Sequence, residues 1–344
     1  MFDIITIGSA GWDVFFQIPE SHIIKNPTLL HKLGFRTDGA QCLSLGSKLR
    51  ADGFASYSGG GATNSAVAFS RLGLKTACVY KTGADIFGEG IERELAAEKV
   101  TSFRSSSSSL STDFSSIIIA SHGSRTVLVH RGAASSLSAR DLKNLNAPWF
   151  YLNPSGIPFS VINTLTKNLR RAGSKIAFAP SREYLSLGIE KLKPLLNRMA
   201  AVFLNREEAS FLTSLPYNQE EKLFESLDAA IEGVAVMTEG ARGVIVSDGR
   251  LRWRAGIFKN QHRLDRTGAG DAFGAGFVSG LIFAGESCTK SVCNDQNIRL
   301  AIRLGSANAG SVVERLGAKA GLLTKREFTS AARWKRLSIK KRAA

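Results

Sequence analysis

Residues 265–271 read Asp-Arg-Thr-Gly-Ala-Gly-Asp and run directly into the small and apolar stretch from Ala272 to Phe277. This pattern predicts a glycine turn that opens a helix, with Asp271 in its first turn. The first amides of a helix lack partners and the helix dipole is positive there, so anionic oxygens are favoured. Asp271 could accept a proton from a substrate hydroxyl, or it could simply cap a tightly packed helix. We expect a phosphoryl-transfer site.

The spacing of the glycines excludes two common nucleotide-binding motifs. The dinucleotide motif needs Gly-x-Gly-x-x-Gly after a strand, whereas Gly274 falls one residue too late. A Walker A loop ends in Lys followed by Ser or Thr, and no glycine run in the sequence ends that way. The site must therefore follow another nucleotide-binding design.

The composition indicates a globular protein. Of the 344 residues, 44% are hydrophobic, which is enough for a sizeable core. No apolar run reaches the length of a membrane span and no secretory signal is evident, so we expect a cytoplasmic protein without a membrane partner. The four cysteines and five histidines have no disulfide or zinc-ligand spacing. The formal net charge of +16 is concentrated partly in residues 333–342, and such runs are usually solvated, so nucleic acid is not the expected partner.

Short β-rich runs alternate with helical stretches, which predicts an α/β fold with a parallel sheet covered by helices. The predicted strands are 3–7, 76–80, 150–152, 176–179, 202–204 and 234–237, and the predicted helices are 63–72, 85–99 and 159–172. A hairpin around Asp248-Gly249 is expected to close the nucleotide end of the sheet.

Two regions interrupt this alternation, and we interpret both as one small β-sheet lid. They are 12–58, which is long and weakly periodic, and 111–131, which alternates around the turn signal His122-Gly123-Ser124. The serine run 105–109 reads as a linker. We therefore expect one domain over 1–323, with lid segments at about 12–58 and 105–133, and a basic tail over 324–344.

The 265–271 motif, together with Gly59-Gly60-Gly61-Ala62-Thr63-Asn64 and the run from Lys81 to Gly88, resembles ribokinase-like (PfkB-type) carbohydrate and nucleoside kinases. The resemblance covers about residues 1–323. It implies a three-layer, doubly wound, mostly parallel sheet with a small β lid, and transfer of the γ-phosphoryl group of ATP to a hydroxyl. Asp271 would then be the catalytic base, and the amides of Gly268, Ala269 and Gly270 would form the anion hole.

The resemblance also implies an acceptor site. Asp13 lies just past the first strand, where it would hold sugar hydroxyls, and Gly60, Gly61 and Asn64 match a second sugar-contacting motif. Read without the family, Asp13 is equally a turn residue and Asn64 a helix cap. Arg131 is the basic residue that we expect to face the cleft.

Asn205 and Glu208 resemble the family's Asn-x-x-Glu element, which acts on Mg²⁺, largely through water, and on phosphate. A capping box is the structural alternative. The predicted nucleotide-binding residues are Asn205, Thr238, Gly240, Gly243 and Asn308. Some relatives also bind a monovalent cation near Asp265 and the segment 315–317, which makes K⁺ a second candidate ion.

The lid is expected to determine which acceptor binds. Aromatic residues there could stack on a purine or simply form the core of the lid: Phe15, Phe16, Phe35, Phe54 and Tyr57. Basic residues could instead contact an acceptor phosphate: Lys32, Arg36, Lys48, Arg50 and Arg131.

We expect a free sugar or nucleoside as the acceptor. The run from Phe178 to Arg182 departs from the Asp-x-Asn-x-Arg of the ribokinase branch, which weakens the case for ribose. The alternatives are a sugar-phosphate kinase and a non-catalytic nucleotide- or sugar-binding protein. A homodimer through the lid is typical of this family.

Overall fold

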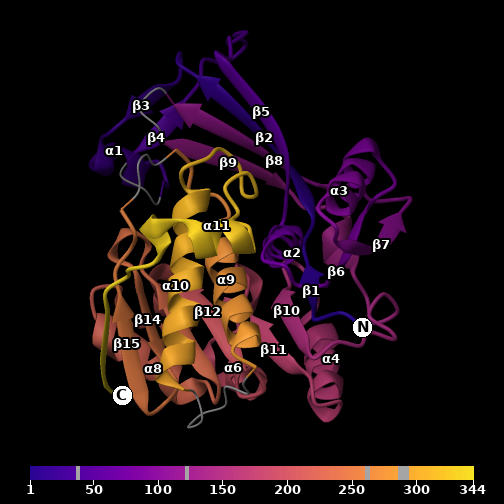
Figure 1. The fold of residues 1–344 in the computed structure, drawn as a ribbon. Helices are drawn as coiled ribbons and strands as arrows, with labels where there is room; N and C mark the ends of the chain where they lie inside the picture. Colours follow the sequence, from indigo (N-terminus) through magenta and orange to yellow (C-terminus); the bar gives the residue numbers. More distant parts are fainter. Residues whose placement is uncertain (36–38, 121–123, 260–263, 286–293) are drawn as a thin grey trace.

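The computed structural model describes residues 1–35, 39–120, 124–259, 264–285 and 294–344. Within them, a smaller sheet lies above one end of the strands of a large, helix-covered sheet (Figure 1). The large sheet has ten strands in the order β16-β15-β14-β13-β12-β11-β10-β1-β6-β7. Neighbouring strands from β13 to β7 in this order pair in parallel, whereas β14, β15 and β16 each pair antiparallel with their neighbours. The ten strands of the large sheet are β1 (Ile4–Gly8), β6 (Thr76–Gly83), β7 (Thr101–Ser107), β10 (Trp149–Asn153), β11 (Lys175–Phe178), β12 (Ala201–Asn205), β13 (Val234–Thr238), β14 (Val244–Ser247), β15 (Leu251–Ala255) and β16 (Ile339–Ala343).

Helices cover both faces of this sheet, because successive residues of a buried strand point to opposite sides. Ile4 of β1 packs in one hydrophobic cluster and Ile5 in the other. The first layer consists of α2 (Gly61–Arg71), α3 (Ile86–Ala97), α9 (Ala269–Phe283) and α10 (Asp295–Val312). The second consists of α4 (Phe159–Arg171), α6 (Ile189–Leu196), α7 (Arg206–Thr213) and α8 (Glu220–Ala230). This confirms the predicted three-layer, doubly wound fold.

The glycines inside α9 let this helix pack closely against its neighbours. A Cβ at Gly276 would lie 2.8 Å from the Cα of Gly305 in α10, and one at Gly280 would lie 2.5 Å from the Cα of Ala301. This close packing offsets the roughly 1 kcal/mol that each helical glycine costs relative to alanine.

The smaller sheet forms the predicted β lid, in the strand order β5-β2-β8-β9. Its strands are β2 (Gly11–Ile18), β5 (Gly53–Gly59), β8 (Asp113–Ala120) and β9 (Arg125–His130). The same region contains β3 (His22–Ile24), α1 (Pro27–Lys32) and β4 (Ala40–Cys42). Arg36 and two residues of the predicted turn, His122 and Gly123, lie outside the described residues.

The serine run differs from its prediction as a linker. Ser105 to Ser107 belong to β7, which pairs in parallel with Lys81 to Gly83 at the edge of the large sheet. The second lid segment therefore begins at β8 and not at 105. Serine carries little strand preference of its own, and the pairing with β6 determines its conformation here.

The basic tail also differs from its prediction, because residues 324–344 pack onto the domain. Strand β16 adds to the large sheet beside β15, where Figure 1 places the C-terminus. Phe328 and Trp334 are buried, and Lys341 forms an ion pair of 3.2 Å with Asp295. The short segments here are α11 (Lys325–Ser330) and η3 (Ala332–Trp334). Apolar anchors and acidic partners thus hold a segment that reads as a solvated charge run.

None of the helices in the described part of the chain is long and apolar enough to cross a membrane.

Candidate active site

Asp271 meets two amide side chains from distant parts of the chain. Its Oδ2 accepts a hydrogen bond of 2.9 Å from Nδ2 of Asn64 in α2, and its Oδ1 accepts one of 3.2 Å from Nδ2 of Asn153 at the end of β10. The structure thus brings together two predicted residues, Asp271 and Asn64, and adds Asn153. A polar residue at the carboxyl end of a buried strand, followed by Pro154, is the signal that could have identified it.

The environment of Asp271 changes its proton affinity. Burial raises the pKa of its carboxyl to about 6, while the Asn64 hydrogen bond and the Lys319 ammonium act to lower it. The two amide donors are neutral, so they orient the carboxylate without holding it permanently ionised. A carboxylate with a pKa near 6 is deprotonated at neutral pH and is a stronger base than an ordinary Asp.

The turn before α9 has the conformation that glycine favours. Gly268 is the N-cap residue with φ 76°, and a Cβ there would lie 2.5 Å from the Cβ of Ala318. The amide of Ala269 donates a long bond of 3.3 Å to the carbonyl of Arg266. Helix geometry leaves the amides of Gly270 and Asp271 without partners inside the helix. Of the three amides predicted to form the anion hole, that of Gly270 is therefore free within the helix, next to Asp271, and that of Ala269 makes only the long bond to Arg266.

Gly60 and Gly61, where β5 gives way to α2, let the backbone lie close to Ser9 and Asn153 at the ends of β1 and β10. Gly60 has φ +98°, and a Cβ there would lie 2.5 Å from the carbonyl oxygen of Ser9. A Cβ on Gly61 would overlap the side-chain amide of Asn153. The amide of Gly61 also donates a bond of 3.1 Å to Oγ of Ser9. Gly61 therefore makes room for the side chain that holds Asp271.

Asp13 lies on lid strand β2, opposite Tyr57 of β5. A side chain at Gly59 would overlap its carboxylate, so the glycine leaves space for it. Burial raises the pKa of Asp13, a hydrogen bond from Ser115 and the ammonium of Lys319 lower it, and Asp265 raises it. Asp13 is thus a partly buried carboxylate in a strand at the base of the lid and not a turn residue.

Lys319 is a buried cation that the sequence analysis did not identify. Its Nζ lies 3.5 Å from Oε1 of Glu94 on α3 and forms a hydrogen bond with Oγ of Ser58 on β5. Its charge acts on both Asp13 and Asp271. A lysine between two alanines carries no pattern that distinguishes it from a surface residue, so no sequence signal indicated its burial.

Arg131 lies at the root of the lid, just after β9. Its Nη1 is 3.6 Å from Oδ2 of Asp113, and about half of its side chain is exposed. The Asp113 carboxylate also accepts bonds from the amides of Gly132 and Ala134. The predicted role of Arg131 in binding the acceptor stays a prediction.

Asn205 and Glu208 form the capping box of α7. Oδ1 of Asn205 accepts from the amide of Glu208 at 2.8 Å, and Oε2 of Glu208 accepts from the amide of Asn205 at 2.8 Å. Burial raises the pKa of Glu208, and the Asp271 carboxylate adds to this effect. Asn205 and Glu208 thus form the capping box that was the structural alternative, and their predicted role toward Mg²⁺ stays a prediction.

Three of the predicted nucleotide-binding residues lie together at the end of β13, whereas Asn308 lies apart from them in α10. Thr238 ends β13 opposite Asn205, and Gly240 and Gly243 follow it in a turn with φ 57° and 99°. The predicted place of Asn308 beside a nucleotide stays a prediction. Asn308 is fully buried. Its Nδ2 donates a hydrogen bond of 2.9 Å to the carbonyl of Ala272, and its Oδ1 accepts one of 3.0 Å from the amide of Leu323, so its side chain links α9 to the segment after α10.

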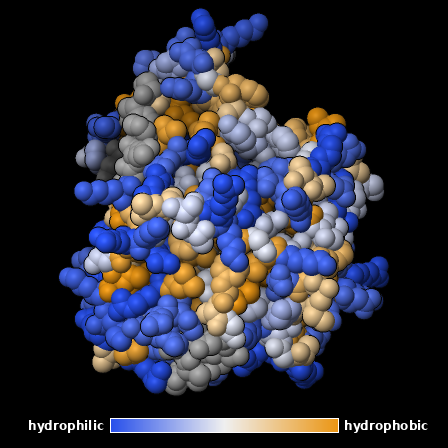
Figure 2. Space-filling view, viewed as in Figure 1, coloured by the Kyte–Doolittle hydropathy of each residue, from blue (hydrophilic) through white to orange (hydrophobic). Residues whose placement is uncertain are grey.

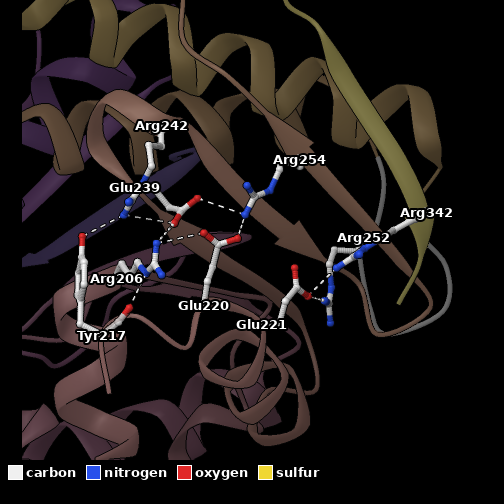
Figure 3. A network of polar contacts seen from close by, with 9 residues as sticks. All are labelled: Arg206, Tyr217, Glu220, Glu221, Glu239, Arg242, Arg252, Arg254 and Arg342. Carbon is white, nitrogen blue, oxygen red and sulfur yellow. Dashed lines mark hydrogen bonds and ion pairs between the residues drawn. The ribbon is translucent and has the colours of Figure 1, made fainter. Parts of the chain in front are cut away.

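A network of charged residues surrounds the turn after β13 (Figure 3). The buried guanidinium of Arg206 lies 3.0 Å from Oε1 of Glu239 and 3.1 Å from Oε2 of Glu220. Arg254 contacts both of these carboxylates from β15, and Arg242 lies 3.7 Å from Glu239. Because Glu239 stands between Thr238 and Gly240, the network fixes the turn that these residues form.

Asp265 begins the glycine turn, and hydrogen-bond donors surround its buried carboxylate. Oδ1 accepts from Nη1 of Arg125 at 2.8 Å and from the amide and hydroxyl of Thr267 at 3.0 and 2.7 Å. Oδ2 accepts from the amide of Gly317 at 3.2 Å. Arg125 begins lid strand β9, so the lid contacts the turn directly.

Among the described residues, no group of three or more His, Cys, Asp or Glu side chains is arranged to hold a metal ion. The carboxylate of Glu208 and the amide of Asn205 are nonetheless the hard oxygen donors that Mg²⁺ prefers when it keeps most of its water. These residues fit a water-mediated magnesium site.

Comparison with known proteins gives a consistent result. Residues 36–325 match the family described as pfkB family carbohydrate kinase. The chain is 28% identical over 279 residues to a ribokinase from Haemophilus influenzae, covering 78% of this chain and 85% of the relative. It is 23% identical over 270 residues to a nucleoside kinase from Methanocaldococcus jannaschii, covering 78% and 83%. The structure of Arabidopsis thaliana ribokinase complexed with ribose and ATP superposes with a TM-score of 0.76 at 19% identity, covering 97% and 99%.

Proposed function

Because the chain belongs to the pfkB family of carbohydrate kinases, a family of phosphotransferases with an alcohol acceptor, we propose that it transfers the γ-phosphoryl group of ATP to a hydroxyl of a sugar or nucleoside. The observation that carries this proposal is the position of Asp271. Its carboxylate is oriented by Asn64 and Asn153 at the N-terminus of α9, next to the glycine turn.

In this mechanism Asp271 is the general base. It takes the proton of the acceptor hydroxyl as that oxygen forms a bond to the γ-phosphorus and the bond from phosphorus to the leaving oxygen of ADP breaks. A positioned base contributes roughly 10² to 10⁴ in rate. The amides of Gly268, Ala269 and Gly270 stabilise the charge on the transferring group, which is the larger task in phosphoryl transfer.

The acceptor would bind between the lid and the start of α2. Oδ1 of Asn64 is buried without a hydrogen-bond partner among the described residues. Such an orphaned acceptor is costly, and a ligand hydroxyl would satisfy it. We assign Asp13 to neighbouring hydroxyls, the backbone of Gly60 and Gly61 to the rim, and Arg131 to the outer part of the site.

ATP would bind at the end of the sheet that carries the charged network. Thr238, Gly240 and Gly243 form the nucleotide turn, and Asn205 and Glu208 would hold Mg²⁺ through water. When bound, Mg²⁺ neutralises charge on the phosphates. We also assign Asn308 to the neighbourhood of the adenine, where its side chain bonds to the carbonyl of Ala272 and to the amide of Leu323.

We also infer that the lid mediates a homodimer. Strand β9 is an edge strand, and its side chains Val127, Leu128 and Val129 are all about half exposed. Figure 2 shows apolar side chains exposed on the lid, in the upper part of the view. An exposed apolar edge strand favours pairing with a second chain. Sedimentation of the purified protein tests this, and a monomer at all concentrations would contradict it.

The function is tested by measuring ATP consumption with Mg²⁺ against a panel of free sugars, nucleosides and sugar phosphates. Asp271→Ala is the inactive control. We expect turnover with one acceptor class and its loss in the variant. Turnover that persists in Asp271→Ala would refute the assignment of the base, and nucleotide binding without turnover across the panel would favour a binding protein.

A further inference from the structure

The surroundings of Asp265 do not fit the monovalent cation that the family resemblance suggests. A cation needs free oxygen lone pairs, but the described neighbours of this carboxylate present N–H and O–H groups: Arg125, Thr267 and Gly317. A cation at the same oxygens would also lie against the Arg125 guanidinium, and like charges at such distances repel strongly.

The guanidinium is placed by more than one contact. Nη1 of Arg125 reaches both Oδ1 of Asp265 at 2.8 Å and Oγ1 of Thr267 at 2.9 Å. Arg125 itself is paired with Ile119 across the lid sheet. Hydrogen bonds between ionised groups are shorter and stronger than neutral ones. The positive charge at the start of the glycine turn is therefore part of the protein.

A second lid residue touches the same region. The ring of Tyr57 on β5 lies 3.0 Å from the position that a Cβ on Gly317 would occupy, and the amide of Gly317 binds Asp265. The lid thus contacts this region from both of its edge strands.

We propose that Arg125 occupies the place of the monovalent cation at Asp265 and positions the 266–270 turn from the lid, so that the protein neither binds nor requires K⁺ there. Arg125 is in this view a positioning residue. Its removal should open a carboxylate site that K⁺ can enter.

Thermal unfolding tests the proposal independently of any activity. The full-length protein and its variants are compared in KCl, NaCl and tetramethylammonium chloride at equal ionic strength. A ligand that binds only the folded state raises the melting temperature. We expect no K⁺-specific rise in the wild type, a rise of a few degrees in Arg125→Ala, and none in Arg125→Lys, which keeps the charge.

Arg50→Ala is the matched control, since Arg50 is an exposed lid arginine whose partner is Asp52. It should behave as the wild type in all three salts. A K⁺-specific rise in the wild type would overturn the proposal, and so would the absence of one in Arg125→Ala.

The second readout rests on the proposed kinase function. In Arg125→Ala we expect kcat to fall about tenfold and KCl to restore several-fold of it, with the wild type indifferent to KCl. Loss of kcat that KCl does not restore would overturn the proposal. If no acceptor is phosphorylated, the proposed function fails, while the unfolding experiment still decides the role of Arg125.

Discussion

The two carboxylates that bracket the glycine turn lie six positions apart in the sequence, yet their surroundings differ in kind. Asp271 accepts hydrogen bonds from the neutral amides of Asn64 and Asn153. Asp265 accepts from the charged guanidinium of Arg125 and from further donors around the turn. Neutral donors orient a carboxylate that must gain and lose a proton, whereas charged donors hold one that must stay in place.

Because of this difference, the two carboxylates of one motif are suited to different tasks. With its pKa raised to about 6, Asp271 is suited to proton transfer near neutral pH. Asp265 instead joins the turn, the lid and the segment after α10 through Arg125 and Gly317. The same residue type therefore takes two roles according to the elements packed around it.

The largest effect is expected for Asp271→Asn, which keeps the size of the side chain and removes the base. We expect kcat to fall by roughly 10² to 10⁴ with the fold retained, because only the general-base contribution is lost. Steady-state ATP turnover and circular dichroism measure the two effects. The control is Asp52→Asn, since Asp52 is an exposed carboxylate of the lid. A fall in kcat of less than tenfold in Asp271→Asn would contradict the assignment of Asp271 as the base.

Asp265→Asn should have an intermediate effect. The substitution removes the charge that Arg125 contacts, and hydrogen bonds to charged groups contribute roughly 1.5–3 kcal/mol. We expect kcat/KM to fall about tenfold and the melting temperature to fall as well, because the lid loses a contact with the turn. If neither kcat/KM nor the melting temperature changed, Asp265 would not be the residue that holds the lid to the turn.

Lys319→Met should shift the pH dependence with a smaller change in rate. Its ammonium lowers the pKa of Asp271, so its removal raises that pKa further above the ordinary value. Activity requires the deprotonated base and is lost as the pH falls through its pKa. The acid limb of kcat/KM, expected near pH 6 in the wild type, should therefore move to higher pH.

Lys81→Met is the control for this prediction. Lys81 is also partly buried, but it bonds to the carbonyl of Ser136 and lies 3.9 Å from Asp141. The acid limb of kcat/KM in Lys81→Met should therefore match that of the wild type. An unshifted limb in Lys319→Met would mean that the ammonium does not act on the base.

The smallest effect concerns the turn between the two carboxylates. A Cβ on Gly270 would meet nothing within 4 Å, so Gly270→Ala should gain roughly 0.5–1 kcal/mol of stability as a helical residue. Gly268→Ala should lose stability, because φ is 76° and the Cβ would collide with Ala318. Urea denaturation measures both, and a stable Gly268→Ala would contradict the turn geometry.

Several features of the site and fold were predictable from the sequence because their signals are local. The glycine turn before Asp271 is required by the backbone at Gly268, and the alternation of strands and helices follows from side-chain periodicity. Asn205 and Glu208 carry the spacing of a capping box, which they form. In each case the residues that determine the structure lie within a few positions of one another.

Other features were missed or predicted differently because their partners are distant in the sequence. Asn153 and Asn64 lie 118 and 207 positions from Asp271. The serines of β7 depend on pairing with β6, and the basic residues of β16 on β15 and Asp295. No local pattern distinguishes such residues from linkers or solvated charge.

By itself, the sequence determined the fold class, the family and the position of a carboxylate at a glycine turn that opens a helix, since backbone requirements and periodicity act over a few residues. Only the tertiary structure decided that Asp271 is held by neutral amides and Asp265 by a guanidinium from the lid. The reason is physical: the donors that surround a carboxylate come from whichever elements the packed layers bring to it, and burial then determines how strongly they act.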